Sequence, residues 1–150
     1  MKKSAGILMY RLKDNEVEVL IVHPGGPFWK NKDEGTWSIP KGEYNEDEEP
    51  LTAAKREFEE ELGVAVDGKF IPLEPVKQNP TKIVTAWAVE GDMDADNIKS
   101  NTIPFEWPPK SGKMIDIPEV DRAGWFSMEE AKKKLMPGQV DLLNQLAKLL

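Results

Sequence analysis

The sequence predicts an α+β fold in which helices pack around a mixed sheet. Two observations support this. Apolar segments typical of strands occur both before and after one central segment with helical periodicity, and helical patterns return near the C-terminus. Elements of both kinds in one chain form a stable core by stacking helices on a sheet. At 150 residues, the chain is expected to form one domain, residues 1–150.

The N-terminal third is predicted to be mostly extended. Strands are expected at Ser4 to Arg11 and at Val17 to Val22, joined by a turn at Asp14-Asn15. A further short strand is expected within Gly35 to Glu43, where apolar and polar residues alternate.

The central segment has the features of an amphipathic helix. Pro50 suits the first helical position, because its missing N–H is not needed there. Gly63 is a favourable C-terminal stop. Apolar residues recur at helical spacing between them, at Leu51, Ala54, Phe58 and Leu62.

The segments after this helix are predicted to complete the sheet. Strands are expected at Lys69 to Val76, at Lys82 to Glu90 and at Ala123 to Phe126. The prolines between Asn101 and Lys113 argue against regular structure there, although a strand edge stays open.

Two C-terminal helices are expected. Ser127 and Glu130 form a capping box, which predicts a helix that runs to about Leu135 and stops at Pro137-Gly138. A second helix is expected at Gln139 to Leu150, where apolar residues again recur at helical spacing.

The central helix carries an unusual acidic face. Glu57, Glu60 and Glu61 are separated by three and four residues, so their side chains share one side. Like charges at this spacing repel by about 0.2–0.5 kcal/mol per pair. A hard divalent cation would remove the repulsion, since Mg²⁺ prefers carboxylate and water oxygens. The alternative is an ordinary solvated acidic face.

Composition excludes several classes of function. Cysteine is absent, so neither disulfides nor thiol chemistry is expected. The 27 acidic residues against 20 basic ones argue against sequence-independent nucleic-acid binding. No apolar run approaches about 20 residues, and Arg11 interrupts the only candidate leader, so neither a membrane partner nor a signal peptide is expected. A cytoplasmic location fits this composition.

The stretch Gly42 to Val64 resembles the box of the Nudix hydrolase (MutT-like) family. Its fixed pattern is G-x5-E-x7-R-E-U-x-E-E-x-G-U, where U is an apolar residue, and every fixed position is met. Gly42 and Gly63 lie near its two ends, and Glu48 and the pair Arg56-Glu57 follow at the required spacing.

The resemblance implies a fold and a chemistry. The fold would be a Nudix-type α/β/α sandwich with a mixed central sheet. Mg²⁺, with Mn²⁺ as an alternative, would bind at Glu57, Glu60 and Glu61. Arg56 would orient these glutamates, and Glu57 is the first choice for the catalytic base, with Glu106 and Glu60 as the alternatives. Members of the family also take a carboxylate from outside the box, and Glu106 and Glu119 are the candidates here.

The lead-in W-x-I-P-K-G-E at Trp37 to Glu43 is similar to that of Nudix enzymes acting on dinucleoside polyphosphates and related nucleotides. It implies substrate-binding roles for Lys41 and Trp37. The alternative for Lys41 is an exposed loop lysine.

The resulting hypothesis is a Mg²⁺-dependent hydrolase of phosphoanhydride bonds in a nucleoside diphosphate linked to another moiety, with dinucleoside polyphosphates favoured. A (deoxy)nucleoside triphosphate pyrophosphohydrolase of the pool-cleaning type is the alternative within the enzyme class. A catalytically silent nucleotide-binding module is the alternative outside it, although such a module would be expected to have lost box glutamates. In every case the expected partner is a small phosphorylated molecule.

Overall fold

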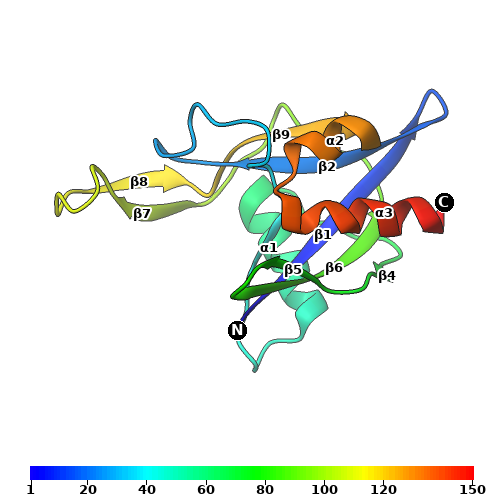
Figure 1. Cartoon of the computed structure of the whole chain (residues 1–150), viewed down its shortest axis with the longest axis horizontal. Coiled ribbons are helices and arrows are strands. Elements are labelled where there is room, and N and C mark those ends of the chain that lie inside the picture. Colours follow the sequence, from blue (N-terminus) through cyan, green and yellow to red (C-terminus); the bar gives the residue numbers. More distant parts are fainter.

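The computed structural model describes residues 1–150 and has a mixed sheet at its centre (Figure 1). The elements, in chain order, are β1 Lys2–Lys13, β2 Glu16–Pro24, β3 Lys41–Glu43, α1 Pro50–Leu62, β4 Ile71–Pro72, β5 Val76–Asn79, β6 Lys82–Glu90, β7 Thr102–Glu106, β8 Met114–Pro118, β9 Val120–Ser127, α2 Met128–Lys134, the 3₁₀ turn η1 Pro137–Gln139 and α3 Val140–Leu149.

The main sheet has seven strands, with the central order β4-β6-β1-β2-β9. The short strand β3 pairs with β1, and β5 pairs with β6. β1 and β6 run parallel, whereas the other pairs in this sheet are antiparallel. The predicted mixed sheet is therefore confirmed.

Alternation along β1 and β2 produces a separate core on each face of the sheet. Leu8 of β1 and Ile21 of β2 face α2 and α3, while Ile7 and Leu20 face α1. Because neighbouring residues of a strand point to opposite faces, two continuous apolar strands support helices on both sides. The result is a three-layer sandwich with α1 on one face and α2 and α3 on the other (Figure 1).

The local signals at turns and helix ends are confirmed. Asp14 and Asn15 both have positive φ in the turn between β1 and β2, where Lys13 pairs with Glu16. Gly63 ends α1 with φ of 75°, and its N–H bonds the carbonyl of Glu59 at 2.7 Å. Ser127 caps α2 by accepting from the N–H of Glu130.

Three predicted strands differ in the structure. Within Gly35 to Glu43 only Lys41–Glu43 forms a strand, and Trp37 and Ser38 make isolated bridges. The segment Lys69 to Val76 contains only the two-residue β4 and the first residue of β5. β9 begins three residues before the predicted Ala123, because the whole of Val120–Ser127 lies beside β2.

Between Asn101 and Lys113 the strand edge that the sequence left open is present at Thr102–Glu106, and the rest of the segment has no strand. β7 pairs with β8 in a separate two-stranded sheet, which projects from the body as a hairpin (Figure 1). Pro104 is tolerated opposite Asp116, since a two-stranded ribbon has a free edge on which a missing N–H costs little. No helix of the structure is both long enough and apolar enough to cross a membrane.

Candidate active site

The acidic face of α1 is turned toward the protein instead of toward solvent. Glu57 and Glu61 are each only 8% exposed, and Glu60 is partly exposed. Gly42 on β3 makes this possible, because a Cβ at that position would overlap the carboxyl group of Glu57. The glycine is needed for close approach here.

A fourth carboxylate, that of Glu119, comes from the junction of β8 and β9. Backbone hydrogen bonds through Asn101 link the junction of β8 and β9 to the end of α1 and so place Glu119 near the other glutamates. The N–H of Asn101 bonds the carbonyl of Glu60 at 2.8 Å, and the carbonyl of Asn101 accepts from the N–H of Glu119 at 2.9 Å. The end of α1 is thus tied through one residue to a segment that lies 59 positions further along the chain.

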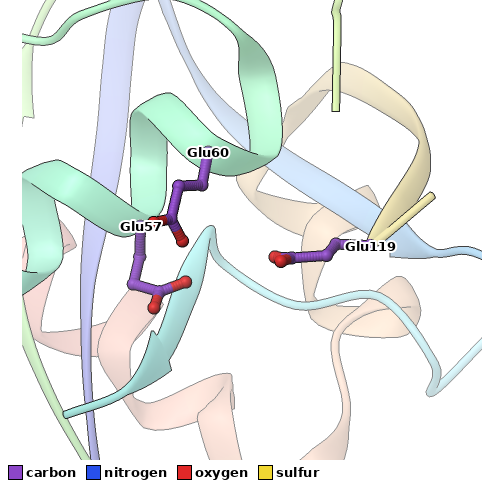
Figure 2. A group of neighbouring side chains, drawn as sticks. All are labelled: Glu57, Glu60 and Glu119. Carbon is purple, nitrogen blue, oxygen red and sulfur yellow. The ribbon is translucent and has the colours of Figure 1, made fainter. Parts of the chain in front are cut away.

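Glu57, Glu60 and Glu119 form a compact carboxylate cluster. One oxygen from each lies within 4.8 Å of the others. Figure 2 shows the side chains of Glu57 and Glu60 on one side of α1, with the carboxylate of Glu119 pointing toward them from across the site. Next to the cluster is a cavity of about 350 Å³, lined by residues that include Lys41, Gly42 and Glu61.

Arg56 holds the cluster together from one side. Its Nε and Nη2 donate to the two carboxylate oxygens of Glu48 at 2.8 and 2.9 Å, a bidentate pair. Its Nη1 also donates to Glu57 at 2.9 Å and to Glu60 at 3.1 Å. These bonds raise the pKa of Arg56, with the Glu48 hydrogen bond as the largest favourable cause, although burial opposes the shift. Two oxygens of the cluster are therefore fixed in position.

The environment opposes ionisation of Glu57 and Glu119. Burial raises the pKa of Glu57, and the neighbouring charge of Glu60 raises it further, although Arg56 opposes both. Burial and Glu60 likewise raise the pKa of Glu119. Such perturbed carboxylates, close together and next to a cavity, are typical of functional sites.

Glu61 lies beside Lys41 and outside the three-carboxylate group. Burial raises the pKa of Glu61 well above its ordinary value, while the charge of Lys41 opposes the shift. Burial lowers the pKa of Lys41, and the charge of Glu61 again opposes. Both residues, like Glu119, also line a second cavity, so the two cavities adjoin at these side chains.

The second cavity, here called the slot, has a volume of about 230 Å³. Glu61 and Glu119 form its end toward the cluster, and Trp29 is its one aromatic wall. Lys41 is the one cation in its lining. The remaining lining residues are uncharged: Val22, Pro24, Thr36, Ser38, Gln78, Val120 and Met136. Sequence reasoning missed Trp29 and Gln78, since neither lies in a motif.

Comparison with known proteins identifies the family. The family model described as NUDIX domain matches residues 2–146. This chain belongs to the NUDIX domain family. A curated relative, Nudix hydrolase 7 of Arabidopsis thaliana, is 40% identical over 63 residues; the match covers 42% of this chain and only 21% of the relative.

Solved structures share the Nudix fold over nearly the whole chain. The binary complex of an Ap4A hydrolase from C. elegans has a TM-score of 0.65 at 20% identity, covering 99% of this chain and 97% of that one. The NUDIX domain of Shewanella oneidensis NrtR, complexed with ADP ribose, has a TM-score of 0.65 at 15% identity, covering 97% and 86%. A mutT/nudix family protein from Listeria innocua scores 0.63 at 20% identity, covering 99% and 92%. The predicted Nudix-type α/β/α sandwich is thus confirmed.

The cluster in this Nudix domain fits a hard divalent cation. All of its donors are carboxylate oxygens, which are the ligands that Mg²⁺ and Mn²⁺ prefer. Of the predicted ligands, Glu57 and Glu60 lie in the cluster, whereas Glu61 lies beside Lys41. The third carboxylate of the cluster is Glu119, one of the two candidates from outside the box.

Two other predicted site residues lie elsewhere. Trp37 is 4% exposed; its Nε1 donates to Asp33, and its ring packs edge-on against His23 and Phe126. It does not line the slot, because this position faces the core. Glu106 lies opposite Met114 toward the tip of the β7–β8 hairpin, where its carboxylate accepts from the N–H groups of Lys110 and Gly112.

Proposed function

We propose that this Nudix domain hydrolyses phosphoanhydride bonds in a nucleoside diphosphate linked to another moiety, with Mg²⁺ or Mn²⁺ as cofactor. One observation supports this above all. Carboxylates of Glu57, Glu60 and Glu119 converge within 4.8 Å, although burial and the charge of Glu60 raise the pKa of both Glu57 and Glu119. A bound divalent cation would remove the repulsion among these carboxylates and would neutralise phosphate oxygens and the leaving oxygen of the substrate.

The residues of the chain then have separate roles. Glu57, Glu60 and Glu119 hold the cation, and Arg56 keeps Glu57 and Glu60 in place. Since Arg56 occupies Oε1 of Glu57, the Oε2 oxygen is left to take a proton from the attacking water. Burial raises the pKa of Glu57, which makes its carboxylate a better proton acceptor. Lys41 provides a positive charge between the cluster and the slot.

The favoured substrates are dinucleoside polyphosphates or related nucleotides. The lead-in at Trp37 to Glu43 supports this class, and so does the slot beside the cluster. The Ap4A hydrolase of C. elegans has the same fold, and we propose a substrate of the same class for this chain. A nucleoside triphosphate pyrophosphohydrolase would use the same cluster, so substrate analysis has to separate the two.

The test is a product analysis with Mg²⁺ and a panel of diadenosine tetraphosphate, nucleoside triphosphates, ADP-ribose and sugar nucleotides. Glu60→Gln and Glu119→Gln are the test variants. We expect each to lose at least ~10²-fold in kcat, as for other preorganised electrostatic groups. Glu59→Gln is the matched control, because Glu59 lies next to Glu60 on α1 but is exposed.

Each result has a definite meaning. The proposal is supported if wild type cleaves dinucleoside polyphosphates and both variants lose this activity. If wild type prefers nucleoside triphosphates, the hydrolytic chemistry stands but the proposed substrate class is wrong. Nucleotide binding without any turnover would instead favour a binding module.

A further inference from the structure

A buried amide fixes the hydrogen-bonding character of the slot. Gln139 is fully buried, and its Oε1 accepts from the backbone N–H of Ile39 at 2.9 Å. A backbone N–H is only a donor, so the amide of Gln139 has one allowed orientation, with its oxygen toward Ile39.

The orientation of the Gln139 amide also determines that of the Gln78 amide. The Nε2 of Gln139 must donate, and it does so to Ser38 Oγ and to the Oε1 of Gln78, each at 3.0 Å. The Oγ of Ser38 in turn donates to the carbonyl of Ile39 at 2.6 Å. If the amide of Gln78 were turned over, two NH₂ groups would face each other. Gln78 is therefore held with its oxygen inward, and its Nε2 is the atom left to bond a ligand.

The packing of β5 against η1 keeps these two residues together. A Cβ at Gly138 would overlap the backbone carbonyl of Gln78, so the two backbones are in close contact at this point. A residue with a side chain at position 138 would push the segments apart. The direction of the Gln78 amide is thus built into the fold.

We propose that Gln78 is a specificity-determining residue, which donates its amide N–H to an acceptor atom on the edge of a nucleobase held in the slot. This inference rests on the proposed function, because it names the part of the substrate that the slot takes. Gln78 lines the same cavity as Trp29, Glu61 and Glu119. A planar ring against Trp29 would then be joined to phosphates that lie toward the carboxylate cluster.

The chemistry of the slot favours a base over a phosphate. Two carboxylates, those of Glu61 and Glu119, line the slot against one cation, Lys41, so the lining as a whole would repel a phosphate that lacks a bound cation. The other lining residues are uncharged, and Trp29 provides a face on which a base can stack, worth about 1–3 kcal/mol. A volume of about 230 Å³ is also small for a whole nucleotide, since ligand pockets commonly measure about 300–1,000 Å³.

The experiment compares wild type with Gln78→Met, which keeps the size but removes the donor, and with Gln78→Glu, which replaces the donor with an acceptor. Lys77→Met is the matched control, since it is the adjacent exposed residue on the opposite face of β5. Binding of AMP and of pyrophosphate is measured by titration calorimetry with Mg²⁺. Pyrophosphate carries the phosphates without a base.

We expect Gln78→Met to weaken AMP binding about 10-fold and Gln78→Glu to weaken it more, with pyrophosphate binding unchanged. The KM for a hydrolysed nucleotide should rise by the same factor, while kcat changes little, because the contact is made equally in the ground and transition states. Equal AMP binding by wild type and Gln78→Glu would overturn the inference, and so would equal losses for AMP and pyrophosphate.

Failure of the two proposals can be told apart. If wild type hydrolyses no phosphoanhydride but Gln78→Met still weakens AMP binding selectively, the hydrolase proposal fails and the role of Gln78 stands. If wild type hydrolyses nucleotides and the Gln78 variants match it throughout, the assignment of Gln78 fails and the hydrolase proposal stands.

Discussion

The carboxylate cluster and the slot lie side by side but are built in opposite ways. Two of the three cluster residues come from one helix, and their charges repel each other. The polar slot residues Ser38 and Gln78, with Gln139 behind them, come from three distant segments, and the hydrogen bonds among them are complementary.

The difference shows what each part does for stability. Buried like charges cost free energy unless something compensates them, so the cluster depends on Arg56, on the absence of a side chain at Gly42 and on the proposed cation. The buried amide of Gln139 is satisfied by the protein itself. The cluster should therefore be sensitive to small changes of charge and position. Three substitutions in and around the cluster test this sensitivity, and a fourth in the β7–β8 hairpin provides a contrast.

The largest effect is expected for Gly42→Ala. The new Cβ would overlap the carboxyl group of Glu57 and push it out of the cluster, and displacement by about 1 Å can cost roughly 10²-fold in kcat. Gly91→Ala is the control, because its Cβ would meet only the flexible end of Met9, with the nearest atom 3.1 Å away. Steady-state kinetics measure both, and full activity of Gly42→Ala would contradict the geometry.

Arg56→Lys should reduce activity about 10-fold and raise the Mg²⁺ concentration needed for half-maximal rate. Lysine cannot bond Glu48 in a bidentate manner while also reaching Glu57 and Glu60. Loss of a residue that orients metal ligands commonly weakens metal affinity about 10- to 100-fold. Arg122→Lys, at an exposed position outside the cluster, should leave the Mg²⁺ dependence unchanged. If the Mg²⁺ dependence of Arg56→Lys is also unchanged, Arg56 does not orient the metal-binding glutamates.

Glu57→Gln should stabilise the metal-free protein, because it removes a buried charge that repels the charge of Glu60. If removing the unfavourable Glu57 charge stabilises the folded protein by about 1 kcal/mol, Tm should rise by about 2–4 °C in a chain of this size. The exposed Glu59→Gln serves as the control, measured by thermal unfolding in EDTA.

The pH dependence of this effect has a definite sign. A raised folded-state pKa means that the folded protein holds the proton of Glu57 more tightly than the unfolded chain does. The stability of wild type should therefore fall relative to Glu57→Gln as pH rises from 4.5 through the raised pKa, and the two should converge at lower pH. A gap that instead widens as the pH falls would contradict the assignment.

The smallest effect is expected for Glu106→Gln, with kcat within about twofold of wild type. Its carboxylate bonds backbone N–H groups in the β7–β8 hairpin, and exposed substitutions of this kind usually change stability by less than about 0.5 kcal/mol. Glu119→Gln is the contrasting variant in the same assay. A large loss of kcat in Glu106→Gln would instead support a catalytic role for Glu106.

Much of the fold could be predicted because its signals are local. The turn at Asp14-Asn15, the cap at Ser127 and the stop at Gly63 depend on residues only a few positions apart. The prolines of the β7–β8 hairpin argue against strands locally and leave only a strand edge open, whereas pairing across the hairpin decides the outcome. Trp37 was assigned to substrate by its motif, but its neighbours His23 and Phe126 place it in the core.

The family, the central helix and the acidic face can be recognised from the sequence alone, because they lie in one contiguous stretch in which spacing sets which side chains share a side. Folding alone brings Glu119 into the cluster, through the backbone bonds of Asn101 to Glu60 and Glu119, and lets Gln139 set the orientation of Gln78, 61 positions away. No local pattern in the sequence records contacts between such distant residues.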